Sequence, residues 1–299
     1  MSALHAEVLV ILPETGPLAR AGLSIKQGLM SAHQASGNTI NFKFLNSNEK
    51  NISTLLKNNV NQKTEMIIGP LARQQVEALI KYDPKIPVLA LNEVPTQHKN
   101  VLQFSLSKDA DAEALSDQFD QDQLKTLYIY RQAGAEANTA AFLTRLQHKF
   151  DGKVEFSEQL PSKLDKRSGV LLLGSNQWLN GLEKLPKKNI YAQAIAIADN
   201  QPMPIGLKFC DVPAIYVQHW PDVVQAYQHQ PTPMAYQRLI AFGGDAWQIS
   251  EMMLAAKMLQ ASMKNIDFQG RSGQIKIVDQ EIQRQPACFM NTKKGLAML

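Results

Sequence analysis

The sequence predicts an α/β protein with two Rossmann-like lobes, in which parallel sheets are joined by a multi-strand hinge beside a cleft. Short apolar runs alternate with amphipathic helical segments, and this βα pattern occurs twice in tandem. Parallel strands that are buried on both faces have such apolar runs, and crossover helices cover the sheet. The last third of the chain has helices followed by a strand hairpin, which indicates that the chain crosses back between the lobes.

The first predicted unit of strand, loop and helix lies between Glu7 and Ala32. Val8 to Leu12 is nearly continuous in apolar residues, as expected of a buried strand. Thr15 and Gly16 are candidate N-caps, and Pro17 has the fixed φ that a first helical turn accepts. The helix that follows is predicted from one stripe of apolar and small residues: Leu18, Gly22, Ile25, Leu29 and Ala32.

The loop sequence GPLAR occurs twice, at residues 16–20 and 69–73. Each copy follows an apolar run and opens a predicted helix, so both loops are expected at the carboxyl edge of parallel strands. Ligands of open α/β sheets bind at that edge. The identity either reflects shared geometry or is a coincidence, because strand-to-helix loops are rich in Gly and Pro in any case.

The remaining elements of the two βα series follow from apolar periodicity and from the residues that end each run. In the first series they are a strand at 40–45, a helix at 51–61, a strand at 66–69, a helix at 71–81, and strands at 87–91 and 101–106. In the second they are a helix at 109–119, a strand at 126–130, a helix at 134–150, strands at 153–160 and 169–173, a helix at 178–185, and strands at 191–198 and 213–217.

The final third is predicted to contain helices at 236–242 and 246–261, separated by Gly243-Gly244-Asp245, with Asp245 as the cap of the second helix. A turn at 270–273 precedes a strand at 274–278, and 283–290 is a further candidate strand. From this pattern, we expect one lobe to comprise 1–106 plus 235–265 and the other 107–234 plus 266–299.

Composition restricts the class of protein. The chain has 299 residues, with 44% hydrophobic and 19% charged residues, which is ordinary for a folded protein. The net charge of +4 is small and gives no basis for a nucleic-acid surface. No apolar run approaches the roughly 20 residues of a membrane span. The start lacks a signal-peptide layout and a cysteine for lipid attachment, so we expect a trimmed domain or a mature form with an added Met.

The chain has two cysteines, Cys210 and Cys288. They are a possible disulfide, which would stabilise the fold by roughly 4–5 kcal/mol on the chain-entropy model. The sequence is equally compatible with two buried thiols.

Motifs for catalysis and for cofactor binding are missing from the sequence. There is no G-x-S-x-G, no H-E-x-x-H, no P-loop ending in G-K-[ST] and no G-x-G-x-x-G after the first strand. The six histidines are scattered, and none has the spacing of a metal ligand pair. We therefore expect no enzyme activity, no cofactor and no metal.

Several segments together resemble the type I periplasmic-binding-protein fold: VLVILPETGPLARAGLSIKQGL, IIGP, PVLALN, AFGGDAWQIS and FQGRSGQIKI. The two GPLAR loops, RLIAFGGDAWQIS at 238–250 and the GRSGQIKI turn with a Cys shortly after it resemble, more narrowly, the C-terminal domain of the LpoA family of penicillin-binding protein activator lipoproteins. The resemblance covers essentially the whole chain.

That resemblance implies a periplasmic, non-catalytic regulator of peptidoglycan synthesis and cell-wall biogenesis. Its partner would be a class A penicillin-binding protein, whose transpeptidase it would stimulate. The full-length protein would be anchored in the outer membrane, with an anchor and signal peptide that this chain does not carry. The alternative is a periplasmic solute-binding receptor for a small polar or anionic ligand held in the cleft between the lobes.

One departure from the amino-acid-binding relatives concerns the ligand. Small hydroxyl residues after the third and fourth strands hold the ligand in those relatives, whereas here the loops offer Leu71, Ala72 and Arg73, then Asn92, Glu93 and Val94. Arg20 and Arg73 are candidates for pairing with an anion, or are exposed helix residues. The cleft candidates are Thr15, Gly16, Arg20, Gly69, Leu71, Arg73, Asn92, Ser175 and Asn176.

Overall fold

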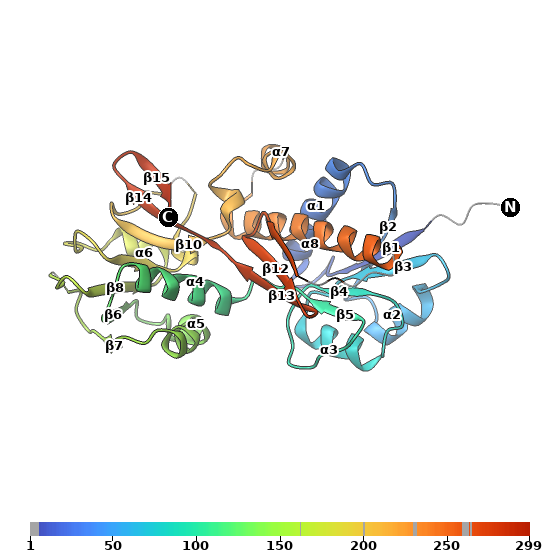
Figure 1. Ribbon diagram of the computed structural model, residues 1–299, viewed down its shortest axis with the longest axis horizontal. Helices are drawn as coiled ribbons and strands as arrows, with labels where there is room; N and C mark the ends of the chain where they lie inside the picture. The colour runs from blue at the N-terminus through green and yellow to red at the C-terminus, as the bar shows by residue number, and fades with distance from the viewer. Residues whose placement is uncertain (1–5, 162, 200, 230–231, 259–262, 264) are drawn as a thin grey trace. The chain divides into compact units, whose positions relative to one another are not determined.

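The computed structural model describes residues 6–161, 163–199, 201–229, 232–258, 263 and 265–299, and the chain forms two compact units (Figure 1). The first unit comprises Met1–Leu106 and Val217–Arg284, and the second comprises Ser107–Tyr216 and Gln285–Leu299. The chain therefore passes between the units three times.

The unit boundaries differ from the predicted lobes, because 217–234 and 266–284 belong to the first unit. The physical reason is packing. Helix α7 (Pro221–His229) lies against helices of the first unit, and Ile275 and Ile277 of the late strands are buried in its core.

The first unit is built on a parallel sheet in the order β2-β1-β3-β4-β5. Its strands are β1 (Glu7–Leu12), β2 (Asn41–Asn46), β3 (Thr64–Ile68), β4 (Val88–Ala90) and β5 (Val101–Gln103). Its helices are α1 (Ala19–Ser36), α2 (Ile52–Asn59), α3 (Arg73–Lys81), α7 and α8 (Met234–Met258). A small sheet of β11 (Ile266–Gln269), β12 (Gln274–Val278) and β13 (Glu281–Gln285) completes it.

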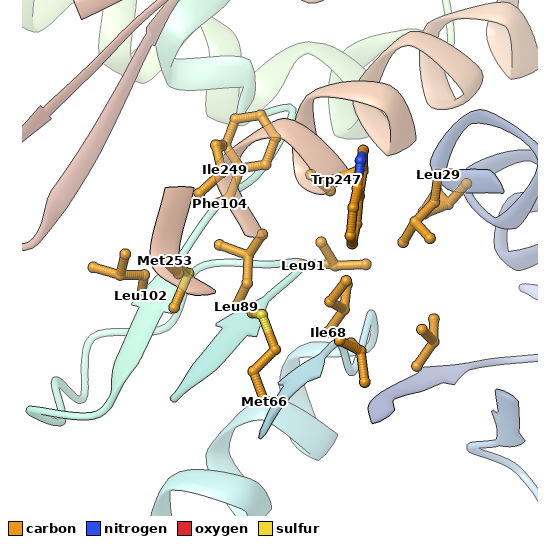
Figure 2. Close-up of a cluster of buried hydrophobic side chains, with 14 of the residues drawn as sticks. Leu29, Met66, Ile68, Leu89, Leu91, Leu102, Phe104, Trp247, Ile249 and Met253 are labelled. Carbon is orange, nitrogen blue, oxygen red and sulfur yellow. The ribbon is translucent and has the colours of Figure 1, made fainter. Parts of the chain in front are cut away.

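The apolar runs of this sheet are buried on both faces, as the sequence predicts. Val8, Val10 and Leu12 pack in a cluster with α1 and α8, whereas Leu9 and Ile11 pack with α2 and α3 on the other face. Figure 2 shows the first cluster, in which Trp247 of α8 lies among side chains of the strands and of α1.

Helices α1 and α8 cross at a contact that only glycine permits. A Cβ at Gly28 of α1 would lie 1.8 Å from the Ile240 carbonyl oxygen of α8, and a Cβ at Gly243 would lie 2.2 Å from the Ile25 carbonyl oxygen of α1. The two glycines thus face the partner helix reciprocally, and each lets a backbone approach that a methyl group would block.

We expect Gly243→Ala to destabilise the first unit by about 1–3 kcal/mol, because the added methyl group must displace the α1 backbone. Helix propensity alone predicts the opposite sign for the change in stability, since Ala is intrinsically favoured over Gly in a helix by about 1 kcal/mol. Urea unfolding measures the effect. Gly181→Ala is the control, because the nearest atoms to its Cβ are 3.5 Å away. Equal stability of the Gly243→Ala variant and the wild type would contradict the contact.

The prediction of two helices around Gly243-Gly244-Asp245 is wrong, because α8 runs through all three residues. Both glycines are required by tertiary packing. Gly243 faces the backbone of α1, and the Arg271 side chain passes 2.4 Å from where a Cβ of Gly244 would lie. Asp245 is inside the helix and fully buried, so it is not an N-cap. Residues 259–261 of the second predicted helix lie outside the described residues.

The first helix also begins later than predicted. Helix α1 starts at Ala19, and its N-cap position is Leu18, which makes no side-chain cap hydrogen bond. Thr15 and Gly16 therefore belong to the loop, where Gly16 has a left-handed φ of +76°.

The second unit contains a seven-stranded sheet in the order β15-β14-β10-β9-β8-β6-β7. Its parallel strands are β6 (Thr126–Arg131), β7 (Lys153–Phe156), β8 (Ser168–Leu173), β9 (Ile190–Ala192) and β10 (Leu207–Asp211). The antiparallel strands β14 (Ala287–Thr292) and β15 (Gly295–Met298) follow the last crossing. Its α-helices are α4 (Lys108–Gln121), α5 (Glu136–Lys149) and α6 (Asn176–Asn180).

The third quarter of the chain departs most from prediction. The sequence pattern predicts no strand at 207–211, where the structure has β10. The strand predicted at 213–217 is instead a 3-10 turn, Pro213–Ile215. The predicted strand at 191–198 is a strand only at its beginning, where it overlaps β9, and its middle is a 3-10 turn, Ala194–Ala196. The predicted strand at 283–290 is divided between β13 and β14, and the unit boundary falls between Arg284 and Gln285, the last two residues of β13.

Cys210 and Cys288 form a disulfide, which settles the choice that the sequence left open. The two residues are direct partners in the antiparallel pairing of β10 with β14. The bridge therefore fixes the C-terminal hairpin to the parallel part of the sheet. Beside it, burial and the Asp122 carboxylate raise the pKa of the Tyr191 hydroxyl well above its ordinary value, so this hydroxyl remains a donor to Asp122.

Candidate functional site

At the carboxyl edge of the first sheet, Thr15 is held by two asparagines: Asn46, the last residue of β2, and Asn48, two residues after it. The Asn46 amide oxygen accepts from the Glu14 backbone N–H at 3.0 Å, and its amide nitrogen donates to Thr15 Oγ1 at 3.3 Å. The Asn48 amide nitrogen donates to the Thr15 carbonyl oxygen. The loop after β1 is thus fixed by side chains that the sequence analysis did not single out.

The two GPLAR loops end neighbouring strands, as predicted, but their geometries differ. Gly69 has a φ of +96° and is joined to Pro70 by a cis peptide bond. A Cβ at Gly69 would lie 2.1 Å from the Ile11 carbonyl oxygen, so no other residue fits there. Helix α1 begins at the fourth residue of the first copy, whereas α3 begins at the fifth residue of the second copy. The two GPLAR segments therefore occupy equivalent positions at the edge of the sheet but have different backbone conformations.

The two arginines of these loops have different surroundings. The Arg20 guanidinium carbon lies 4.2 Å from the centroid of the Tyr236 ring, a cation–π contact between α1 and α8. Arg73 is exposed as the first residue of α3, and it makes no ion pair with the residues that the structure describes. Only Arg73 thus presents a guanidinium without a partner in the described part of the first unit's edge.

Leu71 and Asn92 lie at the same edge of the sheet, and they are hydrogen-bonded to each other. The Asn92 amide nitrogen donates to the Leu71 carbonyl oxygen at 2.9 Å, and the Asn92 amide oxygen accepts from the Glu93 backbone N–H. The Leu71 side chain packs against the core cluster. Both residues therefore brace the loops.

The second unit has a cavity of about 400 Å³ at the carboxyl ends of β6, β8 and β9. Ser175 and Asn176 line it, at the end of β8. The Ser175 hydroxyl caps α6 by accepting from the Trp178 backbone N–H, and the Asn176 amide nitrogen donates to the Ala196 carbonyl oxygen. These two predicted residues thus shape the wall of a real cavity through local hydrogen bonds. The assignment of all nine cleft candidates to one ligand site stays a prediction.

Several lining residues of this cavity were not predicted. Three carboxamide side chains, Gln132, Asn138 and Gln193, lie around it, and Leu115 and Phe142 supply apolar surface. Lys108 and Asp111 of the first turn of α4 line it as well. The available signal is positional, since Gln132 directly follows β6 and Gln193 directly follows β9.

The described ranges contain neither a candidate membrane helix nor a candidate metal centre. None of the helices there is long and apolar enough to cross a membrane. In the same residues, no three His, Cys, Asp or Glu side chains are grouped as a metal site would require.

Comparison with protein families gives a match to the family described as "LppC putative lipoprotein" over residues 3–157, just over half of the 299 residues. A penicillin-binding protein activator LpoA from Glaesserella parasuis serovar 5 (strain SH0165) is 24% identical over 272 residues. That alignment covers 81% of this chain and 46% of the relative. The chain thus spans about half the length of the curated relative that it matches.

Solved structures match the fold over nearly the whole chain. The LpoA (YraM) C-domain from Haemophilus influenzae, described as a regulator of PBP1A, has a TM-score of 0.75 at 17% identity, covering 98% of this chain and 100% of that one. A putative branched-chain amino acid ABC transporter from Chromobacterium violaceum ATCC 12472 has a TM-score of 0.76 at 20% identity, covering 95% and 99%. The predicted α/β fold of the type I periplasmic-binding-protein kind is confirmed, and so is the resemblance to the LpoA family.

Proposed function

The chain belongs to the LppC putative lipoprotein family, and from this membership we propose that it is a non-catalytic regulator of peptidoglycan synthesis. In this proposal it binds a class A penicillin-binding protein and stimulates the transpeptidase of that enzyme. The observation that carries the proposal is the alignment over 272 residues with a relative named as a penicillin-binding protein activator.

Regulation by contact has a thermodynamic requirement. The chain must bind the active conformation of the synthase more tightly than the inactive one, since equal affinity for both would shift nothing. A tenfold shift in that equilibrium needs about 1.4 kcal/mol of differential binding free energy. This amount is within reach of a few interfacial contacts and needs no chemistry on the regulator itself.

A periplasmic location is part of the proposal, with outer-membrane anchoring of the full-length protein. The family description as a lipoprotein supports an envelope location. The Cys210–Cys288 disulfide supports an oxidising compartment, because such bridges form and persist in the periplasm and are rare in the cytosol.

Calorimetric titration of the intact chain into the periplasmic region of a purified class A penicillin-binding protein tests the partner. We expect saturable binding to this enzyme and none to a monofunctional class B transpeptidase, which serves as the specificity control. If the heat of injection does not exceed the heat of dilution for either enzyme, the proposed partner is refuted.

A solute-binding receptor for a small polar or anionic ligand is the second candidate, and the cavity of the second unit favours it. The loops of the first unit disfavour a receptor, because the Asn92 amide already makes hydrogen bonds with Leu71 and Glu93. Tight binding of a small ligand together with no response to the synthase would select the receptor over the regulator.

A further inference from the structure

The cavity of the second unit is bounded by elements that come from distant parts of the sequence. The first turns of α4 and α5 form one side, and the segments after β8 and β9 form another. The Lys108 ammonium donates to the Asn138 carbonyl oxygen at 3.1 Å and so ties the two first turns together. At about 400 Å³, the cavity is in the range of small-molecule sites, which are mostly apolar with a few placed polar groups.

Four carboxamide residues line the cavity, and Asn176 is one of them, already engaged with the Ala196 carbonyl oxygen; the other three are Gln132, Asn138 and Gln193. The Gln132 amide oxygen accepts from the Ser175 backbone N–H at 2.7 Å, which fixes this side chain and leaves its amide nitrogen to donate elsewhere. Gly174 has no space for a Cβ because Gln132 and Trp178 pack on it. The side chains of Asn138 and Gln193 make no hydrogen bond with any residue in the described part of the chain.

A carboxamide offers one acceptor and two donors side by side, and a peptide amide offers the complementary pair. Lys108 and Asp111 add one positive and one negative group to the lining. Opposite charges one helical turn apart suit a zwitterion, whereas a polyanion would meet the Asp111 carboxylate without a second lining cation. Leu115 and Phe142 then provide an apolar surface for a side chain.

We propose that this cavity binds a short zwitterionic peptide, with its amide on the carboxamides of Gln132, Asn138 and Gln193. Its ends would lie at Lys108 and Asp111, and one apolar side chain would lie on Leu115 and Phe142. A free amino acid lacks the amide and would leave the half-buried carboxamides of Gln132 and Gln193 without the partner that a peptide supplies, which weakens binding. The proposal goes beyond the regulator function and does not depend on it, because every lining residue belongs to the second unit.

Calorimetry with the intact chain tests the site, with the dipeptide Ala-Leu as probe. We expect one molecule bound per chain, and about tenfold weaker binding for free leucine and for N-acetyl-Ala-Leu-amide, which lack the amide and the charged ends respectively. No binding of Ala-Leu at millimolar concentration would overturn the proposal. Free leucine bound as tightly as Ala-Leu would overturn the assignment to peptides.

Two variants locate the binding in the cavity. Gln193→Met and Asn138→Leu each remove a carboxamide that makes no hydrogen bond in the described structure, and each is expected to weaken Ala-Leu binding about tenfold. Gln121→Met is the matched control, since Gln121 is an exposed carboxamide at the far end of α4. Unchanged affinity in both cavity variants, with circular dichroism like that of the wild type, would refute the site.

The same two variants separate this proposal from the proposed regulator function. Binding to the class A penicillin-binding protein is expected to stay at the wild-type level in both. Loss of Ala-Leu binding with retained synthase binding supports a peptide site that is independent of the partner surface. Loss of synthase binding in both variants would overturn the independence that we propose.

Discussion

Replacement of Arg271 by methionine is expected to destabilise the first unit by about 3–5 kcal/mol, because two buried carboxylates would lose their cation. Arg271 Nε donates to Asp222 Oδ2 at 2.8 Å, and Arg271 Nη1 donates to Gln248 Oε1 at 2.9 Å. The guanidinium also lies 3.4 Å from Asp245, whose side chain is 0% exposed. The three acceptors come from α7 and α8, so the arginine of the turn before β12 joins these elements.

The Asp245 carboxylate is held by backbone and hydroxyl donors as well. Its oxygens accept from the backbone N–H of Arg271 and Ser272, each at 2.7 Å, and from the Ser272 hydroxyl at 2.6 Å. These donors remain in the Arg271→Met variant, whereas the compensating charge does not. The expected loss therefore reports the cost of an uncompensated buried charge rather than the loss of the whole turn.

A pH dependence separates that charge effect from lost packing. Burial raises the pKa of Asp245 above its ordinary value of 3.8, and Arg271 opposes the rise. For a carboxyl with a raised folded-state pKa, the stability contributed by the protonated form is complete below the unfolded pKa and is lost as pH rises through the folded one. Removal of Arg271 raises the pKa of Asp245 further. We therefore expect the stability difference between the wild type and Arg271→Met to shrink as the pH falls from about 7 to about 4.

Urea unfolding, followed by hydrogen exchange resolved for each unit, measures this prediction. Lys276→Met on the neighbouring strand β12 is the matched control. Its ion pair with Asp267 is half-exposed at 3.7 Å, so its loss is expected to change stability by less than about 1 kcal/mol. A loss in Arg271→Met no larger than in Lys276→Met, or a deficit that does not change with pH, would contradict this account.

Removal of the disulfide is expected to destabilise the second unit by about 4.5 kcal/mol, since the bridge closes a loop between residues 78 apart and restricts the unfolded chain. The double variant Cys210→Ala, Cys288→Ala removes it. The first effect should be faster exchange in β14 and β15, because β14 pairs with β10 at the bridge and β15 pairs only with β14 in the described sheet.

Reduced wild-type chain is the control for this second experiment. Reduction and the double variant should give the same loss in the second unit, while hydrogen exchange in the core strands of the first unit stays unchanged. A loss below about 1 kcal/mol would show that strand pairing alone holds the C-terminal hairpin in place.

Much of the fold is predictable from the sequence, because a strand buried on both faces leaves an apolar run such as Val8 to Leu12 or Gly169 to Leu173. The errors come from tertiary packing. Helix α8 continues through Gly243 and Gly244 although glycine disfavours helices, because α1 and Arg271 occupy the space that side chains would need. Strand β10 was missed because LKFCD mixes polar and apolar residues.

The candidate site was predictable only in part. The topology of parallel strands places Gly16, Gly69 and Ser175 at carboxyl edges, and the structure places them there. Gln132 and Gln193 could not be recognised, because a glutamine after a strand is typical of an exposed loop. Their common cavity depends on the positions of α4 and α5, and no local pattern encodes those positions.

The measurement that tests the central claim most directly is the cross-linked fraction of the product that a class A penicillin-binding protein makes in the presence of this chain. We predict that the cross-linked fraction rises saturably with the concentration of the chain, and that the chain alone forms no cross-links. An unchanged cross-linked fraction at chain concentrations that saturate binding would contradict the proposal that the chain is an activator.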